Sequence, residues 1–198
     1  GSEMCIRDRY TTASRRVFEV IGKHVDVVEQ LSIDEAFMEP AELIGATPDG
    51  VREWANQLRA EIKEETGLPS SIGAGSGKQY AKIGSGRAKP DGVFVIPHEE
   101  QLEILHPMPV NELWGVGPVT EAKLASAGIE TIGDLAALTE KELDIAIGGA
   151  VGKQLWWLAR GVDERPVAPR AVAKQISSEH TYPNDLTQPP EVDTALER

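Results

Sequence analysis

The character of the chain changes at Pro97. Before this residue, segments with the apolar spacing of amphipathic helices alternate with short runs of β-branched and aromatic residues. After it, only helical patterns remain, separated by glycine and proline turns. Alternating helices and strands bury their apolar faces in layers, whereas helices alone pack against one another. We therefore expect an α+β domain over residues 10–97, followed by an all-α domain over residues 98–162.

The first domain is predicted to contain an antiparallel sheet with two helices covering one face. The best marked helix lies between Thr47, a suitable N-cap, and Gly67, a typical helix stop, with Pro48 in its first turn. The expected helices span residues 10–24, 47–67 and 78–88, and the expected strands span residues 25–33, 35–40, 69–77 and 91–97.

Both ends of the chain are expected to lie outside these two domains. Residues 1–9 show no periodicity and begin with Gly-Ser, which is typical of a cloning remnant, so we predict a leader that takes no part in the fold. Residues 163–198 are polar and proline-rich with few apolar anchors, and they are interpreted as a linker.

Composition excludes several classes of protein. A hydrophobic content of 40% is enough to bury a core, but no apolar run reaches the roughly 20 residues of a membrane span, so the cytoplasm is the expected compartment. The single cysteine, Cys5, cannot form an internal disulfide. The histidines lack the spacing of metal ligands; they are His24, His98, His106 and His180.

The charge balance is unfavourable for general attraction to nucleic acid. The chain has 20 Lys and Arg against 32 Asp and Glu, a formal net charge of −12. Residues 78–89 are the exception, because this segment contains four cations and no acid: Lys78, Lys82, Arg87 and Lys89. The cluster is a candidate phosphate contact, and an ordinary solvated helix face is an equally good interpretation of the charge pattern alone.

Two adjacent carboxylates, Asp34 and Glu35, interrupt the apolar stretch QLSIDEAFM at residues 30–38. Successive residues of a regular strand point to opposite faces, so these side chains can converge only at the turn of a hairpin. Converging carboxylates repel each other unless a cation lies between them, and hard oxygen ligands suit Mg²⁺ or Mn²⁺. The pair therefore indicates a magnesium site for phosphate chemistry. A hairpin turn that simply favours aspartate is the alternative.

A glycine-rich turn precedes the predicted helix at residues 78–88. Its sequence, SIGAGSGKQ, would place free backbone N–H groups and the positive end of a helix next to Lys78, an arrangement that suits a phosphate. It is not a Walker A loop, because Gln79 stands where Ser or Thr would follow the lysine. Lys89 lies just beyond the helix and could contact a triphosphate as a point charge.

The second domain carries the pattern LWGVGPVTEAKLASAGIETIGDL at residues 113–135. A glycine turn at Gly115 and Gly117 between two helices is typical of a helix-hairpin-helix motif, whose glycines let the backbone approach a DNA phosphate. Backbone N–H groups could thus bind DNA without basic side chains, which would reconcile DNA binding with the acidic composition. A plain corner between two helices, with glycines as C-caps, is the alternative.

In this order the motifs resemble the Y-family translesion DNA polymerases. The resemblance covers residues 10–182 and rests on LSIDEAF, on AKIGSGRAKPDG, on the glycine turn of the second domain and on ARGVDERPV at residues 159–167. It implies that residues 10–97 are a partial palm domain and residues 98–162 a helix-hairpin-helix thumb. The segment that follows would be the linker and the start of a little-finger domain.

The resemblance also implies roles for individual residues. Asp34 would be a metal ligand and Glu35 a catalytic and metal-binding carboxylate, in a reaction that uses two Mg²⁺ ions. Lys89 would bind the triphosphate of an incoming dNTP, and Lys82 would lie near its phosphates or the nucleic acid. Gly115 and Gly117 would hold the primer strand of a primer–template, and Lys78 is a further candidate for DNA binding. A sliding clamp is a possible partner through a C-terminal region beyond this chain, and no membrane partner is expected.

The chain departs from the family pattern in ways that affect activity. The family opens its palm with a strand bearing a further aspartate ligand and continues into a fingers domain, and neither is found in this sequence. Gly77 stands where the family commonly has asparagine, and the little finger is missing. Because the metal cage needs a third carboxylate, we expect this chain alone to be an inactive fragment of a polymerase that copies past damaged DNA. Two other hypotheses are a non-catalytic, polymerase-like DNA-binding module and an Mg²⁺-dependent phosphohydrolase.

Overall fold

The computed structural model describes the backbone of residues 2–169 and the side chains of residues 8–169. The predicted linker and little-finger segment lies mostly outside these residues. Short 3₁₀ turns at Ala41–Leu43, His98–Glu100 and Val110–Glu112 join the main elements. In chain order the elements are α1 (Ser2–Ile21), β1 (Val28–Gln30), β2 (Ala36–Met38), α2 (Pro48–Thr66), β3 (Ile72–Ala74), α3 (Lys78–Arg87), β4 (Val93–Val95), α4 (Gln101–Leu105), α5 (Pro118–Ser126), α6 (Ile132–Ala137), α7 (Glu140–Ala146) and α8 (Gly149–Ala159).

The strands form two separate two-stranded sheets. β1 and β2 are an antiparallel hairpin in which Gln30 pairs with Ala36, as predicted. β3 and β4 pair in parallel, with Ile72 opposite Val93, whereas an antiparallel sheet was expected. The reason is α3, which connects the two strands as a crossover helix, and a crossover returns the chain in the same direction. The α+β class is confirmed, although its strand pairing is mixed.

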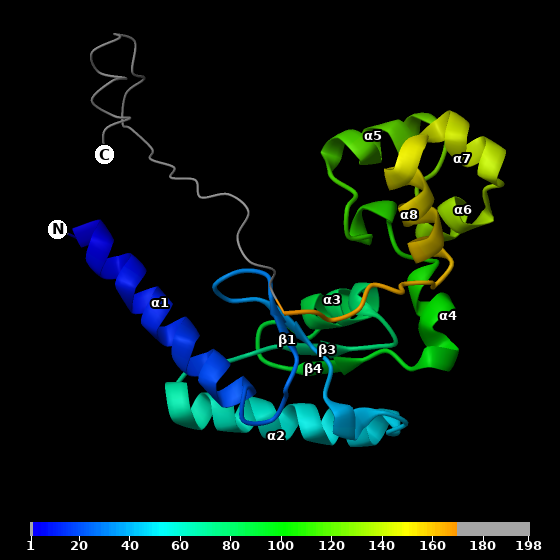
Figure 1. The fold of residues 1–198 in the computed structure, drawn as a ribbon. Helices are drawn as coiled ribbons and strands as arrows, with labels where there is room; N and C mark the ends of the chain where they lie inside the picture. The colour runs from blue at the N-terminus through cyan, green and yellow to red at the C-terminus, as the bar shows by residue number, and fades with distance from the viewer. Residues whose placement is uncertain (1, 170–198) are drawn as a thin grey trace, which may run out of the picture.

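Helices lie on both sides of the β3–β4 pair. α2 runs beneath it and α3 lies above it, while α1 rests on one end of α2 (Figure 1). α1 and α2 bury Val20 and Ile21 against Leu58 and Ile62, and Ile72 of β3 packs onto this cluster. The helices thus cover the sheets on two faces, where one covered face was predicted.

The ends of α2 follow local rules that its sequence displays. The Thr47 side chain accepts a hydrogen bond from the N–H of Gly50, and Pro48 occupies the first turn. At the other end Gly67 adopts φ 74°, a conformation that glycine takes at little cost. Both predicted boundaries are confirmed.

α1 is longer than the sequence suggested. It begins at Ser2, so the backbone of residues 2–9 continues the helix, whereas these residues were expected to lie outside the fold. No proline or glycine interrupts this stretch, and its Glu, Met and Arg residues favour helix. Further along, Val20 and Ile21 are buried at the helical spacing that was predicted.

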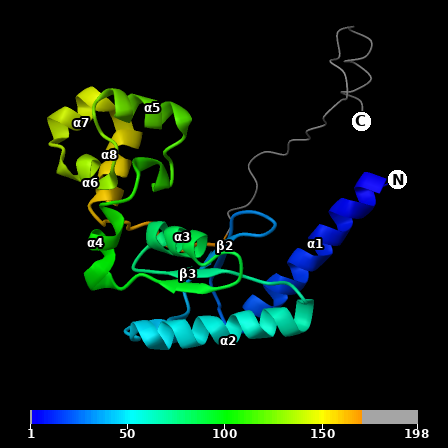
Figure 2. The same ribbon diagram turned by 180° about the vertical axis from the view of Figure 1, so that it is seen from behind.

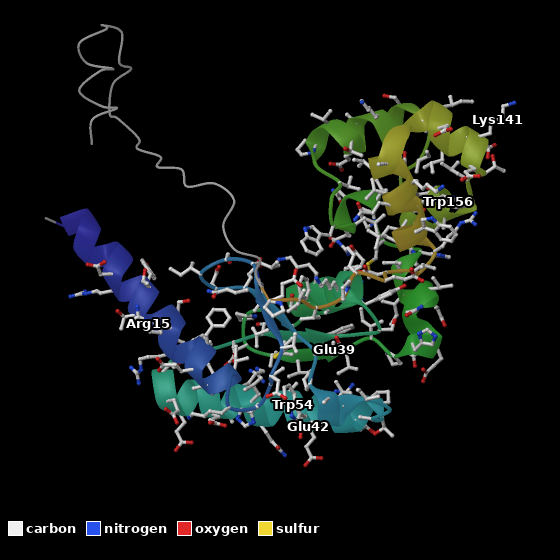
Figure 3. The ribbon with its side chains drawn as sticks, in the orientation of Figure 1. Arg15, Glu39, Glu42, Trp54, Lys141 and Trp156 are labelled. Carbon is white, nitrogen blue, oxygen red and sulfur yellow. The ribbon has the colours of Figure 1, made fainter. Side chains whose placement is uncertain are left out.

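Between residues 98 and 169 the structure has helices and no named strand, with one isolated β-bridge between Pro109 and Thr131, and the helices α5 to α8 make a compact bundle beside α3 (Figure 2). Trp156 of α8 lies inside this bundle and donates from Nε1 to the carbonyl of Leu138 at 2.8 Å (Figure 3). The core of the bundle does not stop at Pro97. Buried Tyr80 and Ile83 of α3 belong to the same apolar cluster as Leu105 of α4.

No helix from Ser2 to Ala159 is long and apolar enough to cross a membrane.

Candidate active site

The hairpin between β1 and β2 carries Asp34 and Glu35 in its turn, as predicted. The backbone N–H groups of Leu31 and Ser32 both donate to the carbonyl of Glu35, at 2.9 and 3.2 Å, and close the turn. The Ser32 hydroxyl donates to Asp34 Oδ1 at 2.6 Å. The two carboxylates therefore leave the chain from a tight turn, so the alternation of a regular strand does not separate them.

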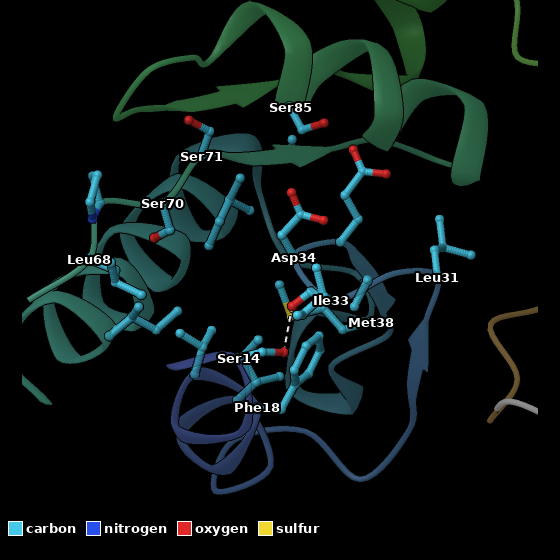
Figure 4. Close-up of a pocket in the computed structure, with 18 of the residues that line it drawn as sticks. Ser14, Phe18, Leu31, Ile33, Asp34, Met38, Leu68, Ser70, Ser71 and Ser85 are labelled. Atoms are coloured by element: carbon cyan, nitrogen blue, oxygen red, sulfur yellow. Dashed lines mark hydrogen bonds between the residues drawn. The ribbon is translucent and has the colours of Figure 1, made fainter. Parts of the chain in front are cut away.

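A pocket of about 610 Å³ lies between the hairpin, α1, the start of β3 and α3. Its walls are largely apolar, with Phe18 of α1 and Met38 of β2 on one side. The Asp34 side chain projects into the pocket from the hairpin turn (Figure 4). The Ser14 hydroxyl donates to the carbonyl of Ile33, which ties α1 to the hairpin turn. Glu35, Lys82 and Lys89 line the same pocket. The structure thus brings together four of the residues predicted to act on a nucleotide and its metal ions.

Glu35 and Lys82 form an ion pair. Lys82 Nζ lies 2.6 Å from Glu35 Oε1, and the side chains keep 38% and 43% of their surface exposed, Lys82 being the less exposed. Lys89 is exposed at the end of α3, next to a cis peptide bond with Pro90. Its ammonium makes no ion pair with any residue that the structure describes. Lys89 is therefore free to meet an anion, whereas Lys82 already has a partner.

The hairpin carboxylates alone do not complete a metal site. Among residues 8–169, whose side chains are placed, no three His, Cys, Asp or Glu residues cluster closely enough to hold a metal ion. Asp34 and Glu35 are nevertheless suitable ligands for a hard divalent cation, because Asp34 is exposed at the pocket and both offer carboxylate oxygens. The donor set fits Mg²⁺ in kind but is short in number.

Lys78 has a different environment from the one predicted. Its side chain is only 8% exposed, its ammonium forms an ion pair with Glu29 of β1, and it lies 5.4 Å from the centre of the Phe37 ring. Glu29 also accepts the backbone N–H of Ala168 at 2.9 Å. The Lys78 ammonium, and then this backbone N–H, lower the pKa of Glu29 below its usual range. These contacts argue against the DNA contact predicted for Lys78.

A side chain of the same protein occupies the N-terminus of α3, where a phosphate was predicted to bind. The Asp163 carboxylate accepts the backbone N–H of Gln79 at 2.8 Å, and a Cβ added at Gly77 would lie 3.0 Å from Asp163 Cβ. Asp163 also forms an ion pair with Arg165 at 2.6 Å. A carboxylate at a helix N-terminus uses the N–H groups and dipole that would attract a phosphate.

The glycines of this turn serve close packing. A Cβ at Gly73 would lie 2.0 Å from the backbone nitrogen of Ser85, and one at Gly75 would lie 2.4 Å from Cβ of Tyr80. Strand β3 and helix α3 therefore touch through their backbones, which only glycine permits. These glycines are explained by packing alone, and phosphate binding by this segment stays a prediction.

The glycine turn of the second domain is open to solvent. Gly115 adopts φ 110°, which requires glycine, and Gly117 is the N-cap of α5 without any side-chain cap. Both residues are exposed. By contrast, α6 and α7 begin with complete capping boxes, formed by Thr131 with Asp134 and by Thr139 with Glu142. The N–H groups at the start of α5 thus remain available to an external acceptor.

Two family profiles match the chain. The profile described as the impB/mucB/samB family covers residues 5–86, and the one described as the DNA polymerase-iota thumb domain covers residues 111–163. DinB from Sulfolobus solfataricus has a similar solved structure, with TM-score 0.74 and 28% identity over 81% of this chain and 47% of that one. A Y-family DNA polymerase chimera gives TM-score 0.77 and 28% identity over 84% and 48%. Over most of its length the chain is therefore similar to Y-family DNA polymerases.

The chain is also similar in sequence to proteins named DNA polymerase IV. The protein of that name from Corynebacterium diphtheriae is 56% identical over 189 residues, which are 96% of this chain and 42% of the relative. DNA polymerase IV of Stenotrophomonas maltophilia strain R551-3 is 44% identical over 178 residues, 90% of this chain and 49% of the relative. The chain spans less than half the length of these curated relatives.

Proposed function

We propose that this chain provides the catalytic hairpin and the thumb of a DNA polymerase that copies a template past damaged bases. The observation that carries the proposal is the gathering of Asp34, Glu35, Lys82 and Lys89 around one pocket, in a chain similar along most of its length to DNA polymerase IV. Carboxylates beside lysines are what nucleotidyl transfer needs, because the reaction is driven by positioning and by neutralising phosphate charge.

Asp34 and Glu35 would hold Mg²⁺, with two ions expected in the intact enzyme. When bound, such ions lower the pKa of the primer 3′-hydroxyl and neutralise the triphosphate and the leaving pyrophosphate. The turn of the hairpin orients Asp34 through the Ser32 hydroxyl. Glu35 would exchange its contact with Lys82 for metal coordination, which would release the lysine toward the pocket.

Lys89 and the released Lys82 would bind the triphosphate of the incoming dNTP. Both line the pocket that holds the carboxylates, and Lys89 is exposed. A lysine ammonium is a compact charge that can follow a phosphate as it moves. The lysines would orient the nucleotide so that its α-phosphate faces the primer terminus.

The primer–template DNA would be held at Gly115 and Gly117. A phosphate oxygen can approach this turn closely, because Gly115 and Gly117 have no side chains, Val116 packs against the core, and α5 lacks a side-chain cap. Binding through backbone N–H groups is compatible with the net charge of −12. Contact with a sliding clamp and residence in the cytoplasm stay predictions.

We expect the chain by itself to bind primer–template DNA without extending it, because Asp34 and Glu35 lack a third carboxylate among residues 8–169. The test is to incubate the purified protein with a fluorescent primer–template, dNTPs and Mg²⁺, measuring binding by anisotropy and extension on a denaturing gel. The expected result is binding with no extension.

Three results would contradict this proposal. Extension that disappears in Glu35→Gln would show that the chain is active alone. Template-independent hydrolysis of dNTPs, abolished by the same substitution, would favour a phosphohydrolase. Equal binding of primer–template and single-stranded DNA would contradict the proposed role of the thumb in holding the primer–template. Glu39→Gln, an exposed glutamate at the far end of β2, is the matched control (Figure 3).

A further inference from the structure

Gln79 is a fully buried polar residue with no part in the proposed chemistry. It lies in the first turn of α3 and has 0% of its surface exposed. Its side-chain Nε2 donates to the carbonyl of Glu112 at 3.2 Å, and its Oε1 accepts the backbone N–H of Trp114 at 3.0 Å. Both ends of the amide are therefore used on one turn of the second domain, next to Gly115.

Asp163 fixes the same helix end from the other side. Its side chain is 1% exposed, it accepts the backbone N–H of Gln79, and it forms two hydrogen bonds with the Arg165 guanidinium at 2.6 and 2.7 Å. Paired hydrogen bonds of this kind have a defined geometry as well as strength. Asp163, where the chain leaves the helical bundle, is thus hydrogen bonded to the first turn of α3.

A stack of side chains extends this contact to the catalytic hairpin. The Arg165 guanidinium lies 4.7 Å from the centre of the Trp114 ring, and the Trp114 ring lies 5.4 Å from that of Phe37 in β2. Phe37 is two residues from Glu35. The glycine turn and the hairpin carboxylates are therefore linked through groups whose positions Gln79 and Asp163 determine.

We propose that Gln79 and Asp163 are positioning residues that hold the thumb in one orientation relative to the hairpin of Asp34 and Glu35. The two parts share an apolar cluster through Tyr80 and Ile83, but apolar packing is non-directional and does not by itself fix an orientation. A buried and fully satisfied polar network restricts relative motion of the two parts, because any rotation leaves its groups unpaired in a dry environment. This orientation can be measured in the free protein, so it can be tested whether or not the proposed function is correct.

The test measures the distance between the two parts by electron paramagnetic resonance. Spin labels are attached at Gln57→Cys on α2 and Lys141→Cys on α7, both exposed positions, in a Cys5→Ser background. The protein with Gln79 and Asp163 intact should give a single narrow distance. Gln79→Ala and Asp163→Ala should lose that narrow peak in favour of a broad distribution, with the circular dichroism of a folded protein retained.

The controls change the same residue types at exposed sites. Gln154→Ala on α8 and Asp144→Ala on α7 should keep the narrow peak. Gln79→Met keeps the side-chain length without burying a charge but loses both hydrogen bonds to residues 112 and 114, so it provides a variant without a cavity if an alanine variant fails to fold. A folded Gln79→Met or Gln79→Ala protein with an unchanged narrow peak would overturn the proposal, because the residue would then be structural only.

Discussion

Lys78 offers the sharpest distinction between a structural residue and a DNA contact. The substitution Lys78→Met keeps the apolar stem but removes the ammonium that pairs with Glu29. Removing one partner of a buried ion pair costs about 3–5 kcal/mol. Glu29 remains 20% exposed and keeps the hydrogen bond from Ala168, so the lower end applies, about 3 kcal/mol.

The free energy of unfolding is measured by urea titration, with circular dichroism and tryptophan fluorescence as two probes of the same transition. Lys141→Met is the control, because Lys141 is exposed at the far side of the bundle, and it should change stability by less than about 0.5 kcal/mol (Figure 3). In a double-mutant cycle, Lys78→Met with Glu29→Gln should show a coupling energy of about 2 kcal/mol.

The same variant is then titrated with primer–template DNA at several salt concentrations. A lysine that neutralises a phosphate contributes about 0.9 to the slope of log affinity against log salt. We expect Lys78→Met to leave that slope unchanged, because the ammonium faces Glu29. A stability loss below about 1 kcal/mol, the value of an exposed ion pair, together with a reduced salt slope would refute this reasoning and restore the DNA contact.

Three further substitutions have defined outcomes. Burial raises the pKa of Asp163, but its hydrogen bonds with Arg165 and with the N–H of Gln79 outweigh burial and hold this pKa below its usual range. The ionised carboxylate therefore stabilises the fold at neutral pH, and this stabilisation is lost as the pH falls through the lowered pKa. Asp163→Asn should flatten the decline in the free energy of unfolding below about pH 4, and an unchanged decline would contradict this. Gly73→Ala should prevent folding, as judged by circular dichroism, because its Cβ would lie 2.0 Å from a backbone nitrogen of α3. Thr131→Ala should lower the unfolding free energy by about 1 kcal/mol through loss of the α6 capping box, and a change under a few tenths would count against the cap.

Local rules explain the features that could be predicted from the sequence. The ends of α2 follow from Thr47 and Gly67, which act on backbone groups within three or four residues. The position of Asp34 and Glu35 at a turn follows from the period of a strand, which would otherwise separate them. In each case the physical cause and the sequence signal lie in the same short segment.

Features set by distant contacts could not be predicted in the same way. The acceptor for the Gln79 N–H at the start of α3 is the Asp163 carboxylate, 84 residues further along the chain. The partner of Lys78 is Glu29, 49 residues away, so the basic cluster at residues 78–89 could not reveal that one of its members is buried. Glycine-rich turns also look alike whether they approach a phosphate or another backbone, and Gly73 does the latter.

Gln79 gave no signal in the sequence except that it broke the Walker A pattern. Its importance depends on the turn at residues 112–114, which lies on a part of the chain that was assigned to another domain. A glutamine in the first turn of a helix is ordinarily exposed. Only the packing of the second domain against α3 buries it.

The apolar cluster that joins Tyr80 and Ile83 of α3 to Leu105 of α4 determines how cooperatively the protein unfolds. Two domains with separate cores can melt one after the other and can be released by a protease as folded pieces. Here the helices after Pro97 share their core with α3, so slow amide hydrogen exchange should disappear from both regions in one step. Cleavage after Pro97 would expose the apolar surface shared by α3 and the later helices, and both fragments would then unfold.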